Sequence, residues 1–103
     1  MRKSNIVAAA ALAASLVATS VAAFAYPGQN MAKDAKITIQ QAESIALKAV
    51  PGKIVAEELE SEQGGTGLRY SFDIKTAAAT KEVGVDAQTG AVLEDSTEGA
   101  GAD

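Results

Sequence analysis

Apolar residues recur at helical spacing in the segment that precedes Pro51. Thr38 is placed to cap this helix, because Gln41 follows three residues later and completes a capping box. Pro51 ends the helix, since the residue before a proline is disfavoured in the α conformation. The expected buried face comprises Ile39, Ala42, Ile45, Ala46, Ala49 and Val50, with Leu47 at its margin. The pattern therefore predicts one amphipathic helix.

Residues 68–75 alternate strictly between apolar and polar side chains, which is typical of a strand buried on one face. A strand of this kind belongs to an antiparallel sheet with one face in solvent. Tyr70 and Phe72 could line a pocket, but at period-two spacing they are more simply core residues. The apolar positions are Leu68, Tyr70, Phe72 and Ile74, and the polar ones are Arg69, Ser71, Asp73 and Lys75.

Residues 53–62 are apolar first and acidic later. A strand is favoured over a helix because Ile54 and Val55 are β-branched and follow a break at Pro51. A helix over the glutamate-rich half remains an alternative. If the segment is a strand, we expect Val55 and Leu59 to share its buried face.

The segment from Val83 to Leu93 has the pattern of a β-hairpin, with two short apolar runs around a turn. Asp86 can accept hydrogen bonds from backbone N–H groups two or three residues later. Gly90 can adopt the positive φ that closes such a loop without steric cost. We expect a connecting loop of about three to four residues.

The order of these elements is one helix followed by strands joined by short connections. An amphipathic helix can cover the apolar face of an antiparallel meander, and neither layer could bury its apolar side alone. We therefore predict a two-layer α+β domain over residues 37–95, with one helix on three to four antiparallel strands. Residues 26–36 show no apolar period and are expected to form a linker, and residues 96–103 a disordered tail.

Residues 1–25 have the order of a secretory signal peptide. Arg2 and Lys3 precede an Ala/Leu/Val-rich run, and the small residues Ala23 and Ala25 predict cleavage between Ala25 and Tyr26. An uncleaved membrane anchor is the alternative, because the run is just long enough to span a bilayer. We expect an exported protein, periplasmic or secreted, that has no membrane contact after cleavage.

Composition narrows the possible chemistry. The chain contains no histidine and no cysteine, so it lacks the commonest general base, metal ligand and strong nucleophile, and it has no thiol for a lipid anchor. Without Arg2 and Lys3 the nine basic residues fall to seven against thirteen acidic ones, a net charge of −6 that opposes nucleic-acid binding. We therefore expect no enzyme activity, no cofactor and no nucleic-acid partner.

A metal site in the Asp86–Gly90 turn is also disfavoured. An EF-hand loop needs an oxygen ligand at its fifth position and a glutamate at its twelfth. Counted from Asp86, these positions hold Gly90 and Thr97, so a plain turn is the better interpretation and no metal is expected.

An acidic run provides the remaining candidate site. In a regular strand Glu58, Glu60 and Glu62 project from one face, where they could recognise a basic partner or hold a loose cation. The alternative is a solvated, charged strand that resists aggregation. We treat these three residues as a candidate partner-binding set.

Taken together, these segments resemble the PepSY domain. The resemblance rests on Ile37-Thr38-x-x-x-Ala42-x-x-x-Ala46-x-x-x-Val50-Pro51-Gly52, the strand ending Glu58-Leu59-Glu60, a Tyr-centred strand, and Val85-Asp86-x-x-Thr89-Gly90-x-Val92-Leu93. It covers about residues 35–95. The link from Thr76 to Ala79 departs from the Asp-Gly or Asn-Gly turn of many relatives.

PepSY domains occur in propeptides of thermolysin-like secreted metallopeptidases and as small exported proteins. The resemblance implies an α+β fold and a non-catalytic regulator or inhibitor of an extracytoplasmic peptidase, which here would act in trans. The alternative is a periplasmic or envelope binding or sensor protein with an acidic face and no peptidase target.

Overall fold

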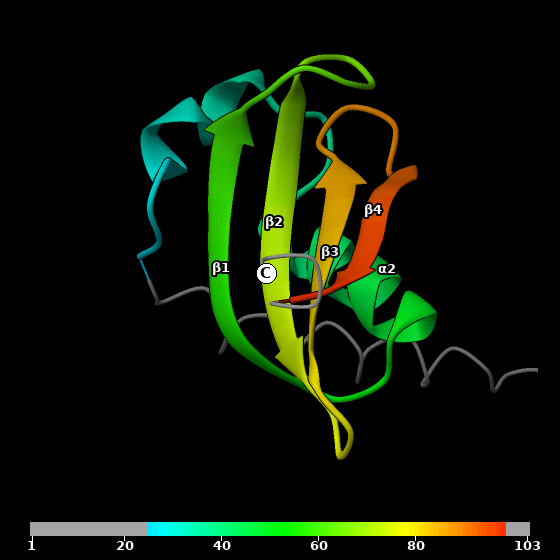
Figure 1. The fold of residues 1–103 in the computed structure, drawn as a ribbon. Coiled ribbons are helices and arrows are strands. Elements are labelled where there is room, and N and C mark those ends of the chain that lie inside the picture. The colour runs from blue at the N-terminus through cyan, green and yellow to red at the C-terminus, as the bar shows by residue number, and fades with distance from the viewer. Residues whose placement is uncertain (1–24, 99–103) are drawn as a thin grey trace, which may run out of the picture.

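Among residues 25–98, four antiparallel strands form one sheet, and one α-helix covers one of its faces (Figure 1). The computed structural model describes residues 25–98, so the predicted signal peptide lies outside this range except for Ala25, and the cleavage site remains a prediction. The strands follow one another in the order β1-β2-β3-β4, which is the predicted meander. The elements are η2 (Gln29–Asp34), α2 (Ile39–Ala49), β1 (Lys53–Ser61), β2 (Leu68–Lys75), β3 (Thr80–Asp86) and β4 (Val92–Thr97).

Helix α2 begins and ends where the sequence predicts. The Thr38 side chain accepts a hydrogen bond from the Gln41 N–H (3.1 Å), and the Thr38 N–H donates to Gln41 Oε1 (2.8 Å), which completes the capping box. Val50 is already extended, as expected of a residue before proline. Ala49, predicted on the buried face, is instead exposed, because it lies in the last turn, at the helix terminus.

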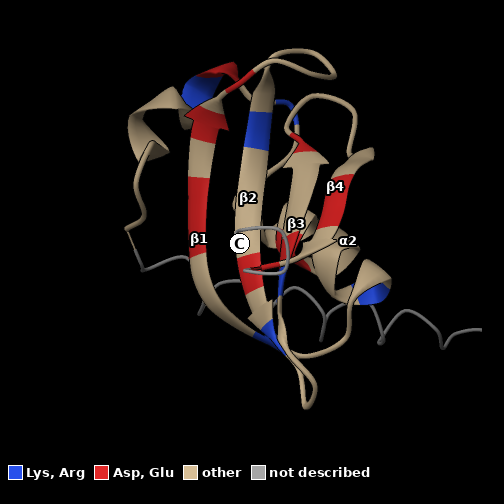
Figure 2. Ribbon diagram, viewed as in Figure 1, with Lys and Arg blue, Asp and Glu red and all other residues tan. Residues whose placement is uncertain are grey.

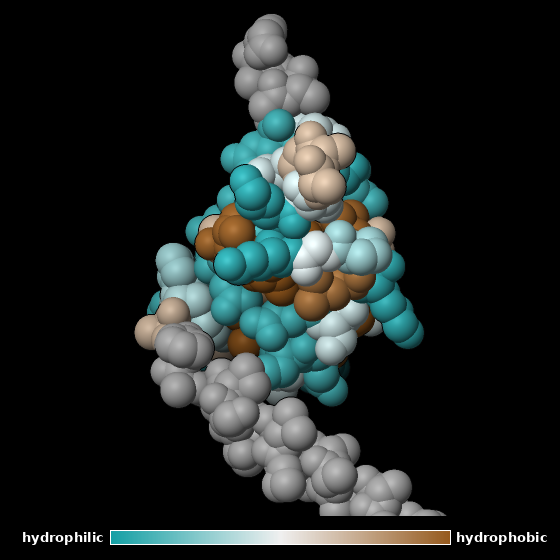
Figure 3. Space-filling view, turned by 90° about the horizontal axis from the view of Figure 1, so that it is seen from below, coloured by the Kyte–Doolittle hydropathy of each residue, from teal (hydrophilic) through white to brown (hydrophobic). Residues whose placement is uncertain are grey.

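The core lies between α2 and the inner face of the sheet. Tyr70 and Phe72 are fully buried in it, as their alternation predicts. The Tyr70 hydroxyl donates to the Ile37 carbonyl oxygen (2.9 Å), so the central strand also holds the chain just before the helix. Seen from below, hydrophobic surface shows in the middle of the molecule with hydrophilic surface on both sides (Figure 3). The buried core residues are Ile39, Ala42, Ala46, Val50, Leu59, Tyr70, Phe72, Ile74, Val83, Val85 and Ala87.

Strand β1 contains a bulge that changes which residues face the core. Ile54 is opposite Ile74 but Ala56 is opposite Asp73, so Val55 is an extra residue on β1. The prediction that Val55 faces inward with Leu59 is therefore wrong for Val55, which is 52% exposed, and right for Leu59, which is buried. The bulge places Ile54 on the core side instead.

Residues 26–36 were predicted to be a linker, but the structure shows them folded against the domain. The Leu59 N–H, on the free edge of β1, donates to the Pro27 carbonyl oxygen (2.9 Å), and η2 follows along the same edge. Tyr26 and Met31 pack against the core from this segment. We call residues 26–34 the N-terminal strap. Its contacts depend on tertiary structure, so no local period marks them.

The C-terminal boundary also differs from expectation. β4 extends to Thr97, and the Glu98 N–H donates to the Thr80 carbonyl oxygen (2.8 Å), so the predicted tail begins no earlier than residue 99. Pairing with β3 satisfies the backbone of a segment whose composition alone is typical of disorder. Residues 99–103 lie outside the described range.

Gly28→Ala should detach the N-terminal strap. Gly28 has φ 84°, and an added Cβ would collide with the Leu59 carbonyl oxygen, whereas Gly67 has φ 97° with open space beside it. We expect Gly28→Ala to lower the free energy of unfolding by about 2–3 kcal/mol, and the control Gly67→Ala by about 1 kcal/mol from φ strain alone. Urea unfolding measures both, and equal losses would show that the strap is not held in this way.

Candidate functional site

The turn between β3 and β4 is organised by the buried carboxylate of Asp86. Oδ1 accepts from the backbone N–H groups of Gln88 (2.8 Å) and Thr89 (3.0 Å), as predicted, and Gly90 takes φ 82°. The loop from Ala87 to Ala91 is slightly longer than expected.

Asp86 also binds a second loop, which the sequence did not reveal. Thr66, in the loop between β1 and β2, donates its backbone N–H to Oδ2 (2.7 Å) and its hydroxyl to Oδ1 (2.9 Å). Burial opposes ionisation of Asp86, but these bonds and those of Gln88 and Thr89 outweigh it and lower the pKa to about 2. One ionised side chain therefore holds together both loops at this end of the sheet.

No helix or strand among residues 25–98 covers the outer face of the sheet, and this face is strongly acidic (Figure 2). Cross-strand register places carboxylates from all four strands on it, and we call this set the acidic face. Lys53 and Lys75 lie opposite each other at one end of the sheet, away from most of these acids. The acidic face comprises Glu58, Glu60, Asp73, Glu82, Glu94 and Glu98.

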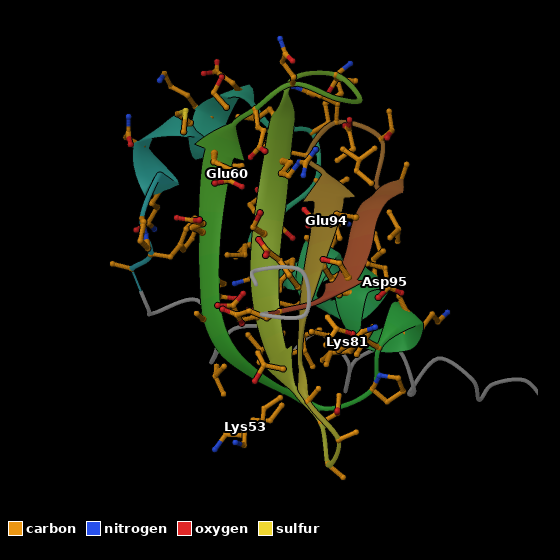
Figure 4. All side chains as sticks on the ribbon, viewed as in Figure 1. Lys53, Glu60, Lys81, Glu94 and Asp95 are labelled. Carbon is orange, nitrogen blue, oxygen red and sulfur yellow. The ribbon has the colours of Figure 1, made fainter. Side chains whose placement is uncertain are left out.

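Two of the three residues proposed as a partner-binding set lie on this face. Glu58 is exposed opposite Ser71, and Glu60 accepts a hydrogen bond from the Ser71 hydroxyl (2.6 Å) (Figure 4). Glu62 follows the end of β1 and is exposed, and its charge contributes to the field at Glu58.

Arg69 lies beneath this acidic surface on the central strand. Its side chain is only 9% exposed, and it donates from Nη1 to Glu94 Oε1 (3.2 Å) and from Nη2 to the Gln63 carbonyl oxygen (3.2 Å). The absence of a side chain at Gly84 on β3 provides the space for Arg69, because a Cβ there would lie 3.2 Å from Arg69 Cδ. The sequence predicted a solvated outer face, but at Arg69 and Ser71 this was wrong, since longer side chains from neighbouring strands cover them.

The centre of the acidic face is hollowed. A cavity of about 300 Å³ opens there, and its lining contains carboxylates but no lysine or arginine among the described residues. The residues that line it are Pro27, Ala56, Glu57, Glu58, Ser71, Asp73, Glu82 and Glu98.

Partial burial and mutual repulsion both raise pKa values on the acidic face. Partial burial and then the charge of Glu60 raise the pKa of Glu58, and partial burial and then the charges of Glu94 and Asp73 raise that of Glu82. A cationic ligand would relieve this repulsion. Within residues 25–98, no group of three acidic side chains has the arrangement of a metal site.

Glu57 borders the cavity on the acidic face, but it lies opposite the core residue Phe72 and its carboxyl group contacts Glu43 of α2, on the helix side of β1. Burial, followed by a hydrogen bond with Glu43 of α2 and the charge of that residue, raises the pKa of Glu57 to about 7. Its Oε1 is buried and accepts no hydrogen bond from the described residues. The pair therefore holds a proton between the helix and the edge strand near neutral pH.

Several members of the acidic face were missed from the sequence, and for different reasons. Alternation with Val83 and Val85 could have assigned Glu82 to the outer face. Glu94 could not be assigned in this way, because a bulge shifts the β3–β4 register between Gly84 and Val85. Simple alternation from Val92 would have placed Glu94 on the wrong face.

These features define a class: a small two-layer α+β domain with carboxylates clustered on the sheet face opposite the helix. The family model for the peptidase propeptide and YPEB domain, PepSY, matches residues 36–95. The chain therefore belongs to the PepSY family, whose domains are of the propeptide and inhibitor type. No curated protein and no solved structure matches the chain.

The helices among the described residues are all too short or too polar to cross a membrane.

Asp86→Ala should be among the most destabilising polar substitutions. It removes a buried acceptor that serves three residues, so we expect a loss of roughly 3 kcal/mol in the free energy of unfolding. The control Asp95→Ala removes a partly exposed ion pair with Lys81 (3.3 Å) and should cost less than about 1 kcal/mol. Similar losses in chemical denaturation would contradict this role for Asp86.

Stability should be greatest at mildly acidic pH. The folded protein binds the Glu57 proton more tightly than the unfolded chain, so the free energy of unfolding falls as pH rises from 4.5 to about 7. Asp86 has the opposite effect, and its stabilisation is lost as pH falls from 3.8 to about 2.

Two isosteric variants separate the two declines in the dependence of stability on pH, one above pH 4.5 and the other, the acid branch, below pH 3.8. Glu57→Gln should flatten the decline between pH 4.5 and 7 while the acid branch persists, and Asp86→Asn should remove the contribution of Asp86 to the acid branch. Urea unfolding at intervals of half a pH unit measures both. A Glu57→Gln profile parallel to that of the wild type would refute the assignment.

Proposed function

We propose that this chain is a non-catalytic, exported regulator or inhibitor of an extracytoplasmic peptidase, and that it binds through the acidic face. Membership of the PepSY family carries the proposal, because these domains occur in peptidase propeptides. The mature protein would begin at Tyr26, the first residue of the N-terminal strap, so removal of the leader would leave the described fold intact.

The acidic face supports the choice of surface. Glu58 and Glu60 project from it beside a hollow lined with carboxylates, so its partner should present lysine or arginine. In the neighbouring loop, Gln63 to Thr66 are exposed, yet the loop is tied to Asp86 through Thr66. A loop held in place before binding loses little conformational entropy on contact, which favours inhibitors.

A second function follows from the same hollow. An envelope binding or sensor protein without a peptidase target could use these carboxylates for a small cationic ligand. Such a protein would bind the cation in solution but leave proteolysis unchanged, which separates the two functions.

Inhibition by the purified mature protein tests the proposal. Residues 26–103 should reduce casein hydrolysis by an extracytoplasmic metallopeptidase of the same organism. Glu58→Gln should weaken the inhibition constant by roughly three- to tenfold, with a reduced dependence on salt, because Glu58 is exposed on the acidic face and the substitution removes its charge.

The matched control is Asp34→Asn, which removes one exposed negative charge from η2, away from the acidic face. It should inhibit as the wild type does. If no extracytoplasmic peptidase fraction is inhibited by the wild-type protein, the proposed function is wrong. Equal weakening by both variants would show that net charge, rather than the acidic face, controls binding.

A further inference from the structure

The two edges of the sheet are treated differently in this fold. The edge of β1 is occupied by the N-terminal strap, through the bond from the Leu59 N–H to the Pro27 carbonyl oxygen. β4 is the other edge strand, and among residues 25–98 its only strand neighbour is β3 (Figure 1). An open edge offers backbone donors and acceptors to an added strand.

The ladder shows which groups on β4 are available. The Glu98 N–H donates to Thr80, and in an antiparallel pair the residues that bond the partner strand alternate with residues that point away. Ser96 and Glu94 therefore direct their backbone groups toward β3, in step with Glu98. Asp95 and Thr97 direct their N–H and carbonyl groups toward the open edge.

The charges on β4 determine which kind of strand can pair with its open edge. β4 and the residue after it carry Glu94, Asp95 and Glu98 and no basic residue. Glu94 already contacts Arg69 of β2 (3.2 Å), whereas Glu98 forms no ion pair with the described residues. Asp95 contacts Lys81 of β3 (3.3 Å), and Figure 4 shows the two side chains together beside β4. A second copy of the chain would place like charges opposite each other, which destabilises a strand pair, whereas a basic strand would place opposite charges there.

We propose that β4 binds an extended, basic segment of a partner protein by strand addition. Asp95 and Thr97 supply the backbone hydrogen bonds, and lysine or arginine at alternate positions of the segment lies beside Glu94 and Glu98. Val92, 43% exposed at the start of the strand, gives an apolar contact at one end. The inference deepens the proposed function by naming the contact edge, and it rests on that function for the nature of the partner.

A short peptide tests the edge directly. The probe is acetyl-(Lys-Thr)4-amide, titrated into the mature protein and followed by calorimetry and amide hydrogen exchange. We expect binding with at least tenfold slower exchange at Asp95 and Thr97, and acetyl-(Glu-Thr)4-amide should not bind. Acetyl-(Lys-Pro)4-amide has the same charge but lacks half of its N–H groups, so it should bind at least fivefold more weakly.

Two variants at one position separate backbone pairing from side-chain contact. Thr97→Pro removes an N–H that points to the open edge and leaves the β3 ladder intact, so it should fold and lose at least tenfold in peptide affinity. Thr97→Val keeps that N–H and should bind as the wild type does. Both lose the contact of the Thr97 hydroxyl with Lys81 (3.4 Å), which makes them a matched pair, and circular dichroism checks their folding.

The outcomes are distinct. Equal binding of the proline peptide or of the acidic peptide overturns the proposal, as does exchange protection confined to other strands. Protection of Asp95 and Thr97 by self-association alone would assign the edge to a second copy and also overturn it. If Thr97→Pro loses the peptide but inhibits the peptidase normally, the edge is not the peptidase contact and the proposed function stands. Peptide pairing without any peptidase inhibition supports the edge and refutes the proposed function.

Discussion

The structure depends most on one buried carboxylate, that of Asp86. It is 1% exposed and accepts hydrogen bonds from Thr66, Gln88 and Thr89, which come from two loops far apart in the sequence. The β3–β4 hairpin and the β1–β2 loop are thereby fixed to each other at one end of the sheet. An ionised group can be buried here because backbone N–H groups replace its water. The Asp-x-x-Thr-Gly motif, which begins at Asp86, therefore has a structural role: it fixes the turn between β3 and β4.

The acidic face holds like charges close together, and neighbouring polar groups partly compensate for their repulsion. Arg69 neutralises part of the charge from below, through Glu94, and Ser71 donates to Glu60. Partial burial, and after it the charges of neighbouring acids, still raises the pKa values of Glu58 and Glu82. Like charges on such a surface oppose self-association, and they are complementary to a cationic partner of the kind proposed above.

Most of the fold was predictable because local signals agreed with each other. The capping box at Thr38 and the strict alternation of residues 68–75 each identified an element correctly. The connection after β2 lacks the Asp-Gly or Asn-Gly turn of many PepSY domains, yet the Thr76 side chain accepts from the N–H of Ala79 (3.1 Å) and closes the reversal. The error at Val55 arose from a bulge, which shifts a strand by one residue and has no periodic signature.

The sequence by itself determined helix α2, strand β2, the α+β class and the absence of histidine and cysteine side chains, because these depend on neighbouring residues and composition. Only the tertiary structure decided that the N-terminal strap covers one sheet edge and that Asp86 joins two loops. It also decided that Glu94 lies beside Arg69. These contacts join residues distant in sequence through register and burial, which a local pattern cannot encode.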